Sequence, residues 1–389
     1  MTKSVLMTSK GAEPLAKLKI GVAGAPRGTS FLAGMHAYED RAEIAAVYDP
    51  DQRAREEFTT ETGVPALEHY DQLLEQVDAI IVASPQHHHV PQAVAALDRG
   101  VHVLSEVPAA VSLEQARQLV AAVRASDAVY MLAENYCYSR PNLIVGAMAK
   151  AGLFGELYFG EGEYLHEMKG WHTDSSGNPT WRYFWQVGRT GHSYPTHSVG
   201  PLLQWFDDRI VAVSCVGSGR HTDPEHEIDD TILLLARTSR QALLSIRLDL
   251  LSNRPHLMDY YSLQGTAGAY EAPRAEGQQP RVYLAGKSPA EQWQPLETYA
   301  DEFLPERYRQ VAEGAGHWGA DSFPVRDFID AVNENTAPPF DIYAALDMTL
   351  PGIVSETSFY EGGAWKAVPN PRLWDAGVVS EPGKEAPLA

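Results

Sequence analysis

Cysteine is nearly absent from this sequence. Cys137 and Cys215 are its only cysteines, and their spacing matches neither a zinc site nor a disulfide framework. We therefore expect two buried thiols and a reducing compartment, and we predict a cytoplasmic location. The consecutive His87, His88 and His89 predict no metal site, because neighbouring side chains point in different directions. We expect these histidines to pack at a loop or helix start.

Positive charge is also scarce. The sequence has 31 Lys and Arg residues against 51 Asp and Glu residues, a formal net charge of −20. Such a surface repels nucleic acids and anionic membranes, so we expect neither as a partner. No run of about 18 apolar residues is present, so we expect no membrane span. Residues 1–19 lack the apolar core and cleavage site of a signal peptide, which again favours the cytoplasm.

The length of 389 residues exceeds that of most single hydrophobic cores and predicts two domains. A content of 44% hydrophobic and 21% charged residues is typical of globular proteins. We place the boundary near residue 136, with residues 15–136 in the first domain and residues 137–389 in the second.

Strand and helix patterns alternate along residues 18–134. Ser112 and Gln115 form a capping box at the start of one of the helices. The expected strands are 18–23, 43–49, 78–83, 101–104 and 129–133, and the expected helices are 51–60, 90–99 and 112–125. This alternation predicts an α/β domain with a parallel sheet and helices on both faces.

The pattern changes after a helix at residues 141–151 that Gly152 ends. The expected strands are 157–164, 211–216, 230–236, 242–250, 259–263 and 269–271, followed by helices at 321–333 and 342–360. They predict an α+β domain with a mostly antiparallel, open sheet, and we expect two or more copies of the chain to associate through it. The Pro/Gly-rich tail after Pro369 is expected to return over the surface.

The first strand leads into a glycine-rich turn, Gly21-Val22-Ala23-Gly24-Ala25-Pro26-Arg27-Gly28. Dinucleotide folds need glycine here because the backbone approaches a pyrophosphate at a helix N-terminus. Pro26 replaces the second glycine of G-x-G-x-x-G and Gly28 comes one residue early, so the turn alone fits any α/β protein. Asp49 ends the second strand near the spacing expected of a carboxylate that binds the adenosine ribose; taken alone, it equally fits a helix-start acid. Together they predict a Rossmann domain that binds NAD rather than NADP.

Two pairs of tyrosine and histidine stand out in the second domain. Tyr164 and His166 share one face of a predicted strand. Tyr194 and His197 are three residues apart at the start of a helical pattern, which predicts one shared helix face. Phenols and imidazoles carry protons with different pKa values and suit general acid–base catalysis. Tyr164 and His166 taken alone equally fit ordinary core or surface packing.

Aromatic residues surround a single arginine nearby. Trp171, Trp181 and Trp185 flank Arg182 in the sequence. Indole rings stack on the C–H faces of sugars, and a guanidinium binds hydroxyl groups or an anion. This set predicts a carbohydrate site, although tryptophans in such a pattern equally fit an ordinary core.

With these motifs in view, the chain resembles the Gfo/Idh/MocA oxidoreductase superfamily along nearly its whole length. More narrowly it resembles glycoside hydrolase family 109 and related NAD-dependent glycosidases. Glu106-Val107-Pro108 stands where many sugar dehydrogenases carry Glu-Lys-Pro, whose lysine helps to move a proton, and valine has no proton to give. Tyr194-Pro195-Thr196-His197 keeps a histidine, but Ser193 stands where those enzymes carry an aspartate.

The resemblance implies an NAD-dependent glycoside hydrolase whose NAD is bound and not consumed. Hydride leaves C3 of the sugar, a proton leaves C2, the glycosidic oxygen is eliminated from C1, water adds, and the hydride returns. The resemblance implies catalytic roles for Tyr164 and His166 near C2 and C1 and for Tyr194 and His197 near C3. It implies that Arg182 contacts the substrate together with Tyr164, Tyr194 and His197. The implied NAD-binding residues are Arg27, Gly28, Asp49, Gln86, His89, Glu106, Val107 and Asn135.

Two other functions fit the same residues. One is an NAD-dependent sugar dehydrogenase with His197 as its base and net formation of NADH. The other is a non-catalytic, NAD-bound sugar sensor. The expected ligand is in each case a small carbohydrate, for the hydrolase a glycoside. The characteristic substrate of family 109 is α-linked N-acetylgalactosamine, but residues 167–178 show no recognisable pocket for its acetamido group, so the sugar stays open.

Overall fold

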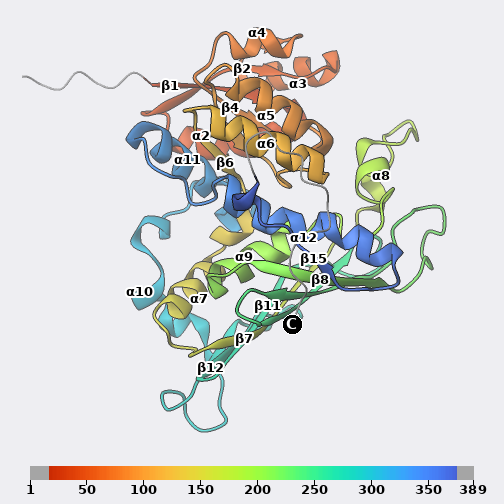
Figure 1. Ribbon diagram of the computed structural model, residues 1–389. Helices are drawn as coiled ribbons and strands as arrows, with labels where there is room; N and C mark the ends of the chain where they lie inside the picture. The colour runs from red at the N-terminus through yellow and green to blue at the C-terminus, as the bar shows by residue number, and fades with distance from the viewer. Residues whose placement is uncertain (1–16, 375–389) are drawn as a thin grey trace, which may run out of the picture.

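The structure is a computed structural model that describes residues 17–374. A parallel sheet with its helices lies at one end of the molecule, and a larger mixed sheet lies at the other (Figure 1). The α/β class predicted from the sequence, with an N-terminal Rossmann domain and a mostly antiparallel open sheet after it, is confirmed.

The N-terminal sheet has six parallel strands in the order β3-β2-β1-β4-β5-β6. Its strands are β1 (Leu18–Ala23), β2 (Ala42–Tyr48), β3 (Ala66–Leu67), β4 (Ala79–Val82), β5 (His102–Ser105) and β6 (Tyr130–Leu132). Every residue of β4 is buried, as expected where helices cover both faces of a parallel sheet. The strand order reverses between β1 and β4, and such a switch point leaves a crevice at the carboxyl ends of the strands.

The helices of this domain connect the strands. They are α1 (Ala25–Gly28), α2 (Leu32–Ala37), α3 (Gln52–Thr62), α4 (Tyr70–Leu74), α5 (His89–Leu97) and α6 (Leu113–Ala125). The hydroxyl of Ser112 accepts a hydrogen bond from the backbone N–H of Gln115 at 3.1 Å, so the predicted cap of α6 is present. The first helix after β1 is broken into α1, a 3-10 turn and α2, and its pieces are too short to show helical periodicity in the sequence.

The second sheet has nine strands in the order β14-β13-β12-β11-β7-β10-β9-β8-β15. They are β7 (Leu157–Leu165), β8 (Ile210–Gly217), β9 (Ile232–Thr238), β10 (Leu243–Asp249), β11 (Leu257–Gly265), β12 (Gly268–Glu271), β13 (Arg281–Leu284), β14 (Gln294–Pro295) and β15 (Lys366–Ala367). Within the described part of this second sheet, β7 and β10 are the only parallel pair, and all other neighbouring strands are antiparallel. The predicted self-association through this sheet stays a prediction.

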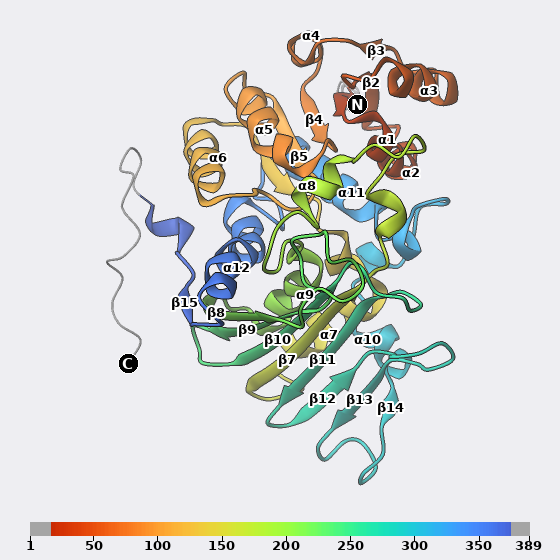
Figure 2. The same ribbon diagram turned by 90° about the vertical axis from the view of Figure 1, so that its right-hand side faces the viewer.

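The remaining helices follow the N-terminal domain in the chain. They are α7 (Arg140–Lys150), α8 (Trp181–Trp185), α9 (Thr196–Phe206), α10 (Ala300–Phe303), α11 (Ser322–Glu334) and α12 (Ile342–Tyr360). Both views show α9 and α12 on the side of the large sheet that faces the N-terminal domain (Figures 1 and 2). A Cβ at Gly162 of β7 would lie 2.6 Å from the carbonyl oxygen of Ser198, so this glycine lets α9 approach the sheet closely.

The C-terminal part of the chain returns to the first domain. Phe340 accepts a hydrogen bond from the backbone N–H of Leu132 at the end of β6, at 2.9 Å. The guanidinium of Arg124 in α6 bonds the carbonyl oxygen of Pro371 at 3.2 Å. The predicted division into residues 15–136 and 137–389 stays a prediction, and the end of the predicted surface tail, residues 375–389, lies outside the described residues.

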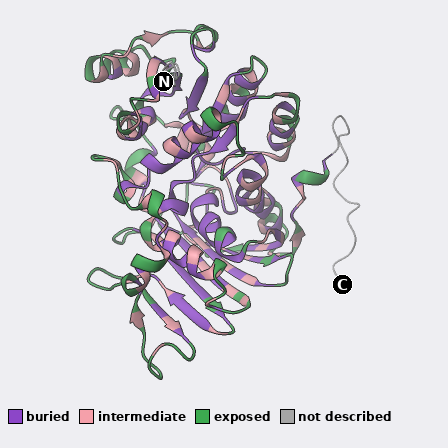
Figure 3. Ribbon diagram, turned by 90° about the vertical axis from the view of Figure 1, so that its left-hand side faces the viewer, coloured by how far each residue is buried: buried purple, intermediate pink, exposed green. Residues whose placement is uncertain are grey.

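Buried residues lie along the strands of both sheets and along the helices that pack on them (Figure 3). Cys137 and Cys215 are both buried and free, as predicted. Within residues 17–374 no helix combines the length and the apolar character needed to cross a bilayer.

Candidate active site

The turn after β1 requires glycine. Gly24 has φ +96°, and a Cβ on it would lie 2.5 Å from the carbonyl oxygen of Ala83. Gly28 packs against β1, where a Cβ would meet Val22 Cγ1 at 2.4 Å. Pro26 occupies the first turn of α1, where its missing N–H and fixed φ do no harm. The departure from G-x-G-x-x-G is therefore compatible with the turn.

Asp49 joins this turn to the end of β2. Its Oδ2 accepts the backbone N–H of Ala25, and its Oδ1 accepts that of Asp51, both at 2.9 Å. The residue is 8% exposed. Each carboxylate oxygen has a second lone pair, so Asp49 holds the turn and still has acceptors to offer a ligand.

A cavity of about 720 Å³ opens at the carboxyl ends of β1, β2, β4 and β5. It runs from Asp49 in the first domain to Arg182 and Tyr194 in the second. Its walls are Gly24, Pro26, Arg27, Tyr48, Asp49, Pro50, Ala83, Ser84, Pro85, Gln86, His88, His89, Gln92, Glu106, Val107, Trp171, Trp181, Arg182 and Tyr194. The crevice expected at the switch point is thus continuous with the second domain.

An ion pair closes one wall of this cavity. Glu106 Oε1 lies 2.5 Å from Arg27 Nε, and its Oε2 accepts the backbone N–H of Val107 at 3.0 Å. Burial alone would lower the pKa of Arg27, but the carboxylates of Glu106 and Asp321 together outweigh this effect and the pKa is raised. The pair holds Arg27 as a fixed cation at the cavity wall.

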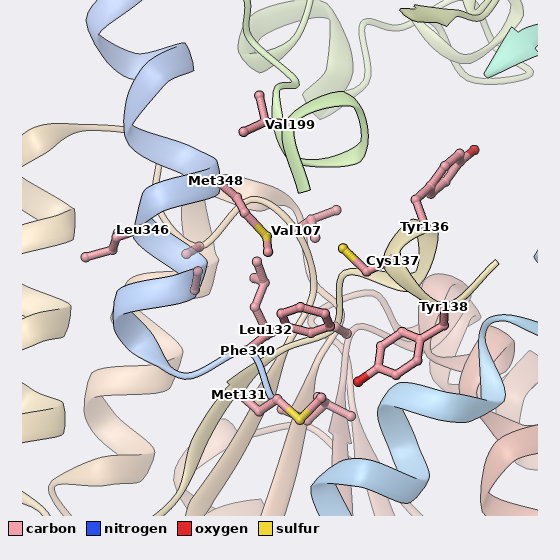
Figure 4. Packing of buried hydrophobic residues seen from close by; sticks show 14 of the residues in the cluster. Val107, Met131, Leu132, Tyr136, Cys137, Tyr138, Val199, Phe340, Leu346 and Met348 are labelled. Atoms are coloured by element: carbon pink, nitrogen blue, oxygen red, sulfur yellow. The ribbon is translucent and has the colours of Figure 1, made fainter. Parts of the chain in front are cut away.

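Val107 lies in an apolar setting. It is 5% exposed, and Figure 4 shows it in one packed cluster with Leu132, Cys137 and Met348. The position at which the related dehydrogenases carry a lysine therefore has hydrocarbon and a thiol around it. Val107 also lines the cavity.

Tyr164 and His166 meet at the end of β7. The Tyr164 hydroxyl lies 3.0 Å from His166 Nδ1. Burial raises the pKa of Tyr164 well above its usual value. Burial, together with the neighbouring His256, lowers the pKa of His166 to about 4. Near neutral pH the phenol is therefore protonated and the imidazole is neutral, so the phenol donates to Nδ1 and His166 carries its proton on Nε2.

His197 is held by a buried carboxylate. Its Nδ1 lies 2.8 Å from Glu134 Oε1, and Glu134 is fully buried. The Tyr136 ring lies 4.1 Å from the His197 ring between centroids, and Tyr261 donates a hydrogen bond to the His197 carbonyl at 2.6 Å. The carboxylate keeps the proton on Nδ1 and leaves Nε2 free to accept one.

Tyr194 joins the two pairs, although the predicted reason was wrong. Sequence periodicity placed Tyr194 and His197 on one helix face, but α9 begins at Thr196 and Tyr194 precedes it. Their rings nevertheless lie 5.0 Å apart, and the Tyr194 ring lies 5.5 Å from that of Tyr164. Pro195 is the N-cap of α9, so the turn before the helix rather than helical spacing brings the rings together.

Arg182 lies between two indole rings. Its guanidinium carbon is 4.4 Å from the centre of the Trp181 ring and 5.2 Å from that of Trp171. Its Nη1 donates to Gln186 at 3.0 Å. Trp185, the third tryptophan of this set, instead stacks on His87 at 4.8 Å and so connects α8 to the first domain.

The residues present fit a dinucleotide. Glycine backbone lies at the cavity wall, and Asp49 keeps free acceptor positions. Gln86 Oε1 and Asn135 Oδ1 are buried without a hydrogen-bond partner among residues 17–374. Buried polar atoms are rarely left unpaired, so these two atoms point to a ligand or a water.

Family comparisons agree with this geometry. Residues 18–134 match the model of an oxidoreductase family with an NAD-binding Rossmann fold. Residues 138–221 and 220–371 match the glycosyl hydrolase 109 C-terminal domain. The chain belongs to glycosyl hydrolase family 109. Its first domain is accordingly an NAD-binding Rossmann domain, and NAD is its cofactor.

Relatives within family 109 cover most of the chain. The family 109 protein of Solibacter usitatus (strain Ellin6076) is 29% identical over 405 aligned residues, which cover 94% of this chain and 90% of that protein. The family 109 protein of Parabacteroides distasonis is 30% identical, with 75% of this chain and 70% of that protein covered.

Solved structures share the fold at low sequence identity. A levoglucosan dehydrogenase in complex with NADH and L-sorbose superposes with a TM-score of 0.78 at 18% identity and covers 92% of this chain and 100% of its own. This similarity shows the fold of the family 109 chain and no more.

The structure brings most of the predicted site residues of this family 109 protein to one place. Arg27, Asp49, Gln86, His89, Glu106, Val107, Arg182 and Tyr194 line the cavity. Tyr164, His166 and His197 lie beside it through their ring contacts with Tyr194 and one another. Gly28 and Asn135 do not line it: Gly28 packs on Val22, and Asn135 donates to Asp321 at 2.6 Å. Their roles toward NAD stay predictions.

The three consecutive histidines make different contacts. The His87 and His88 rings lie 4.0 Å apart. Both ring nitrogens of His89 lie at hydrogen-bond distance from backbone carbonyl oxygens, Pro108 at 2.9 Å and Ser84 at 2.8 Å. His87 stacks on Trp185. No cluster of three metal-ligating side chains occurs in the described part of the chain.

Sequence patterns alone missed two members of the site. Glu134 ends the β6 segment and reaches His197 across 63 positions of the chain. Tyr136 is 2% exposed, and its hydroxyl has no partner within residues 17–374. An acid directly after a buried strand was the available signal for Glu134. Tyr136 offered none, because an aromatic residue after a strand is typical of an ordinary core.

Proposed function

We propose that this family 109 enzyme hydrolyses glycosides by a redox-neutral route. The observation that carries the proposal is the presence of two separate proton-carrying pairs, Tyr164–His166 and Glu134–His197, beside a Val107 that cannot carry a proton. Oxidation of one hydroxyl group needs one base. A reaction that also removes a proton from the neighbouring carbon needs a second, and the site offers two.

The Glu134–His197 pair serves the hydroxyl group at C3. His197 Nε2 accepts the hydroxyl proton, while Glu134 stabilises the imidazolium that forms. When bound, NAD supplies the acceptor for the C3 hydride and holds it for the return step. The C3 ketone makes the hydrogen at C2 acidic.

The Tyr164–His166 pair serves C2 and C1. Tyr164 passes its hydroxyl proton to His166 Nδ1 and takes the C2 proton as the C1–O bond breaks. The proton on His166 Nε2 goes to the departing oxygen. Water then adds its hydroxyl to C1 and a proton to C2, and His197 returns its proton to the C3 oxygen as the hydride comes back. The balance is glycoside plus water giving free sugar plus aglycone alcohol, with no net redox change.

The raised pKa of Tyr164 constrains this scheme. A phenol buried without a cation is a poor base, and a nearby positive charge lowers its pKa. Arg182 and Arg27 both act on the Tyr164 pKa in the lowering direction. Arg182 and Arg27 are therefore the positive charges that favour Tyr164 as a base.

The second candidate function is an NAD-dependent sugar dehydrogenase. It is favoured by the shared fold with a levoglucosan dehydrogenase and by the His197–Glu134 pair, which suffices for oxidation. The two functions differ in redox balance, because the dehydrogenase accumulates one NADH per turnover and the hydrolase accumulates none.

A panel of nitrophenyl glycosides tests both functions at once. Phenolate and NADH absorbance are followed in the same cuvette, and the panel includes N-acetylgalactosaminides, galactosides, glucosides and glucuronides of both anomers. Phenolate without NADH supports the hydrolase. NADH in step with turnover overturns it in favour of the dehydrogenase, and binding without either product indicates a sensor. The enzyme as purified should contain NAD, detectable by mass spectrometry after denaturation.

A further inference from the structure

A second carboxylate–histidine pair lies next to the proposed site. Asp321 holds His317, whose Nδ1 is 2.9 Å from Asp321 Oδ2 and 3.0 Å from Oδ1. Asp321 is 5% exposed, whereas the His317 side chain is 32% exposed. With Nδ1 occupied, Nε2 is the nitrogen that remains for another partner.

Tyr136 connects this pair to the proposed catalytic residues. The Tyr136 ring lies 4.1 Å from the His197 ring on one side and 5.8 Å from the His317 ring on another. Asn135, the preceding residue, donates to Asp321 at 2.6 Å. One short segment, Asn135–Tyr138, therefore carries both a neighbour of the catalytic histidine and the anchor of Asp321.

The backbone around His317 is strained in a specific way. His317 has φ 48° and Trp318 has φ 57°, and Gly319 continues the left-handed run at φ 92°. A bulky residue such as tryptophan rarely adopts this conformation, and such outliers cluster at ligand-binding sites. The backbone N–H of Gly319 bonds the Gly316 carbonyl at 2.9 Å, so the turn is held by its own hydrogen bonds.

Trp318 differs from every other tryptophan of the chain. Its side chain is 67% exposed, the largest exposed fraction of any tryptophan in the structure. Each of the others lies against an aromatic ring or an arginine. Trp318 has no such partner within residues 17–374. A strained backbone thus presents a flat apolar ring to solvent directly after His317 in the chain.

We infer that His317 and Trp318 form an outer subsite that binds the aglycone of the substrate, with the indole against its flat face and His317 Nε2 bonded to a polar group. The inference rests on the proposed function, since only a hydrolase must hold and release an aglycone. The leaving group has to depart into solvent. His317 is a partly exposed neighbour of Tyr136, and Trp318 follows it directly in the chain. The aglycone class that fits is an aryl group or the flat C–H face of a second sugar.

Substitutions that respect the left-handed backbone test the subsite. Trp318→Asn removes the ring, and asparagine tolerates this conformation; Trp318→Phe keeps a flat ring. His317→Asn removes the imidazole in the same way. Trp293→Asn is the matched control, because Trp293 is 38% exposed but lies on Arg281 at the β13–β14 edge of the large sheet.

Paired aryl and methyl glycosides of each panel sugar provide the measurement. Trp318→Asn should raise KM for aryl glycosides roughly tenfold and leave kcat and the methyl-glycoside KM within about twofold. The reason is that the lost contact binds the aglycone equally in the ground state and in the transition state. Trp318→Phe should recover most of the loss, and Trp293→Asn should behave as the parent protein. His317→Asn should raise KM with little change in kcat. Unchanged aryl preference in Trp318→Asn overturns the inference.

A binding measurement separates this inference from the proposed function. Phenyl and methyl C-glycosides of galactose, glucose and N-acetylgalactosamine cannot be cleaved, and calorimetry with the NAD-loaded protein gives their Kd values. A phenyl preference that disappears in Trp318→Asn supports the subsite even where no glycoside is hydrolysed. Absence of a phenyl preference in the parent protein overturns the subsite and leaves the hydrolase proposal standing. A changed oligomeric state in Trp318→Asn by light scattering, with aryl preference intact, assigns the ring to an interface instead.

Discussion

Nδ1 of His197 lies 2.8 Å from Oε1 of Glu134, and the two side chains are 7% and 0% exposed. A hydrogen bond in so dry a setting fixes which ring nitrogen carries the proton, and it stabilises the imidazolium when a second proton arrives. The relationship supports the proposed role of His197 as a base, and it gives the first prediction.

Glu134→Gln should lower kcat by about 10²–10⁴-fold, because an amide can donate to Nδ1 and impose the wrong tautomer on His197. The formation of enzyme-bound NADH in a single turnover should slow by the same factor, which stopped-flow absorbance measures. Glu161→Gln is the matched control. Glu161 lies on the face of β7 opposite to Tyr164 and accepts a hydrogen bond from Ser262. An equal rate of NADH formation in Glu134→Gln and in the control would show that Glu134 takes no part in hydride transfer.

Hydrolysis in deuterated water should place deuterium at C2 of the released sugar, because the proposed route breaks the C2–H bond. Tyr164→Phe should slow this incorporation by about 10²–10⁴-fold. The first hydride transfer should continue in Tyr164→Phe and stop in His197→Ala. Mass spectrometry or NMR of the product reports the label, and a product without deuterium at C2 excludes the elimination route.

Asp49→Ala should weaken NAD binding by about 1–3 kcal/mol, the scale of hydrogen bonds to a charged group. Some of this loss comes through the turn, because Asp49 also accepts the backbone N–H of Ala25. Asp51→Ala separates the two effects, since Asp51 caps α3 and does not line the cavity. Calorimetry gives both Kd values; an unchanged Kd in Asp49→Ala places the ribose elsewhere.

Val107→Lys should not convert the protein into a dehydrogenase. An ammonium group among Leu132, Cys137 and Met348 has no carboxylate partner assigned to it, because Glu106 is already paired with Arg27. Burying a charge without a partner should cost about 2–4 kcal/mol of unfolding free energy, which urea denaturation measures against Val107→Ile. A fully stable Val107→Lys that accumulates NADH would contradict this reading of the site.

Stability should fall as the pH drops from about 6.5 toward 4. Burial lowers the pKa of His192 to about 3 and, with help from His226, that of His172 to about 4. Between the lowered values and the ordinary histidine pKa, the unfolded chain binds more protons than the folded one, so acid favours unfolding. His192→Leu should make stability depend less on pH. The measurement is the difference between the Tm at pH 7 and the Tm at pH 5. The exposed His69→Leu should leave it unchanged; an equal slope in all three proteins would remove His192 as a cause.

The local features of this protein follow from the sequence alone. The turn at Gly24 and the acid at Asp49 predict a nucleotide domain, because strand–turn–helix patterns depend on neighbouring residues. Tyr164 and His166 share a direction because side chains alternate along a strand. The replacement of lysine by Val107 is visible in the sequence, and it led to the prediction of different chemistry.

Tertiary structure decided the partners. Glu134 reaches His197, and Asp321 accepts a hydrogen bond from Asn135. Trp318 has no aromatic or arginine partner among residues 17–374. These relationships depend on segments far apart in the chain. Periodicity even assigned Tyr194 to a helix that begins two residues later, although the ring still reaches His197. Local patterns report only the direction in which a side chain leaves its own element, whereas distances between elements depend on how the two sheets and α9 pack together. The sequence therefore determined the kinds of chemical groups in this protein, and only the folded chain determined which of them act as pairs.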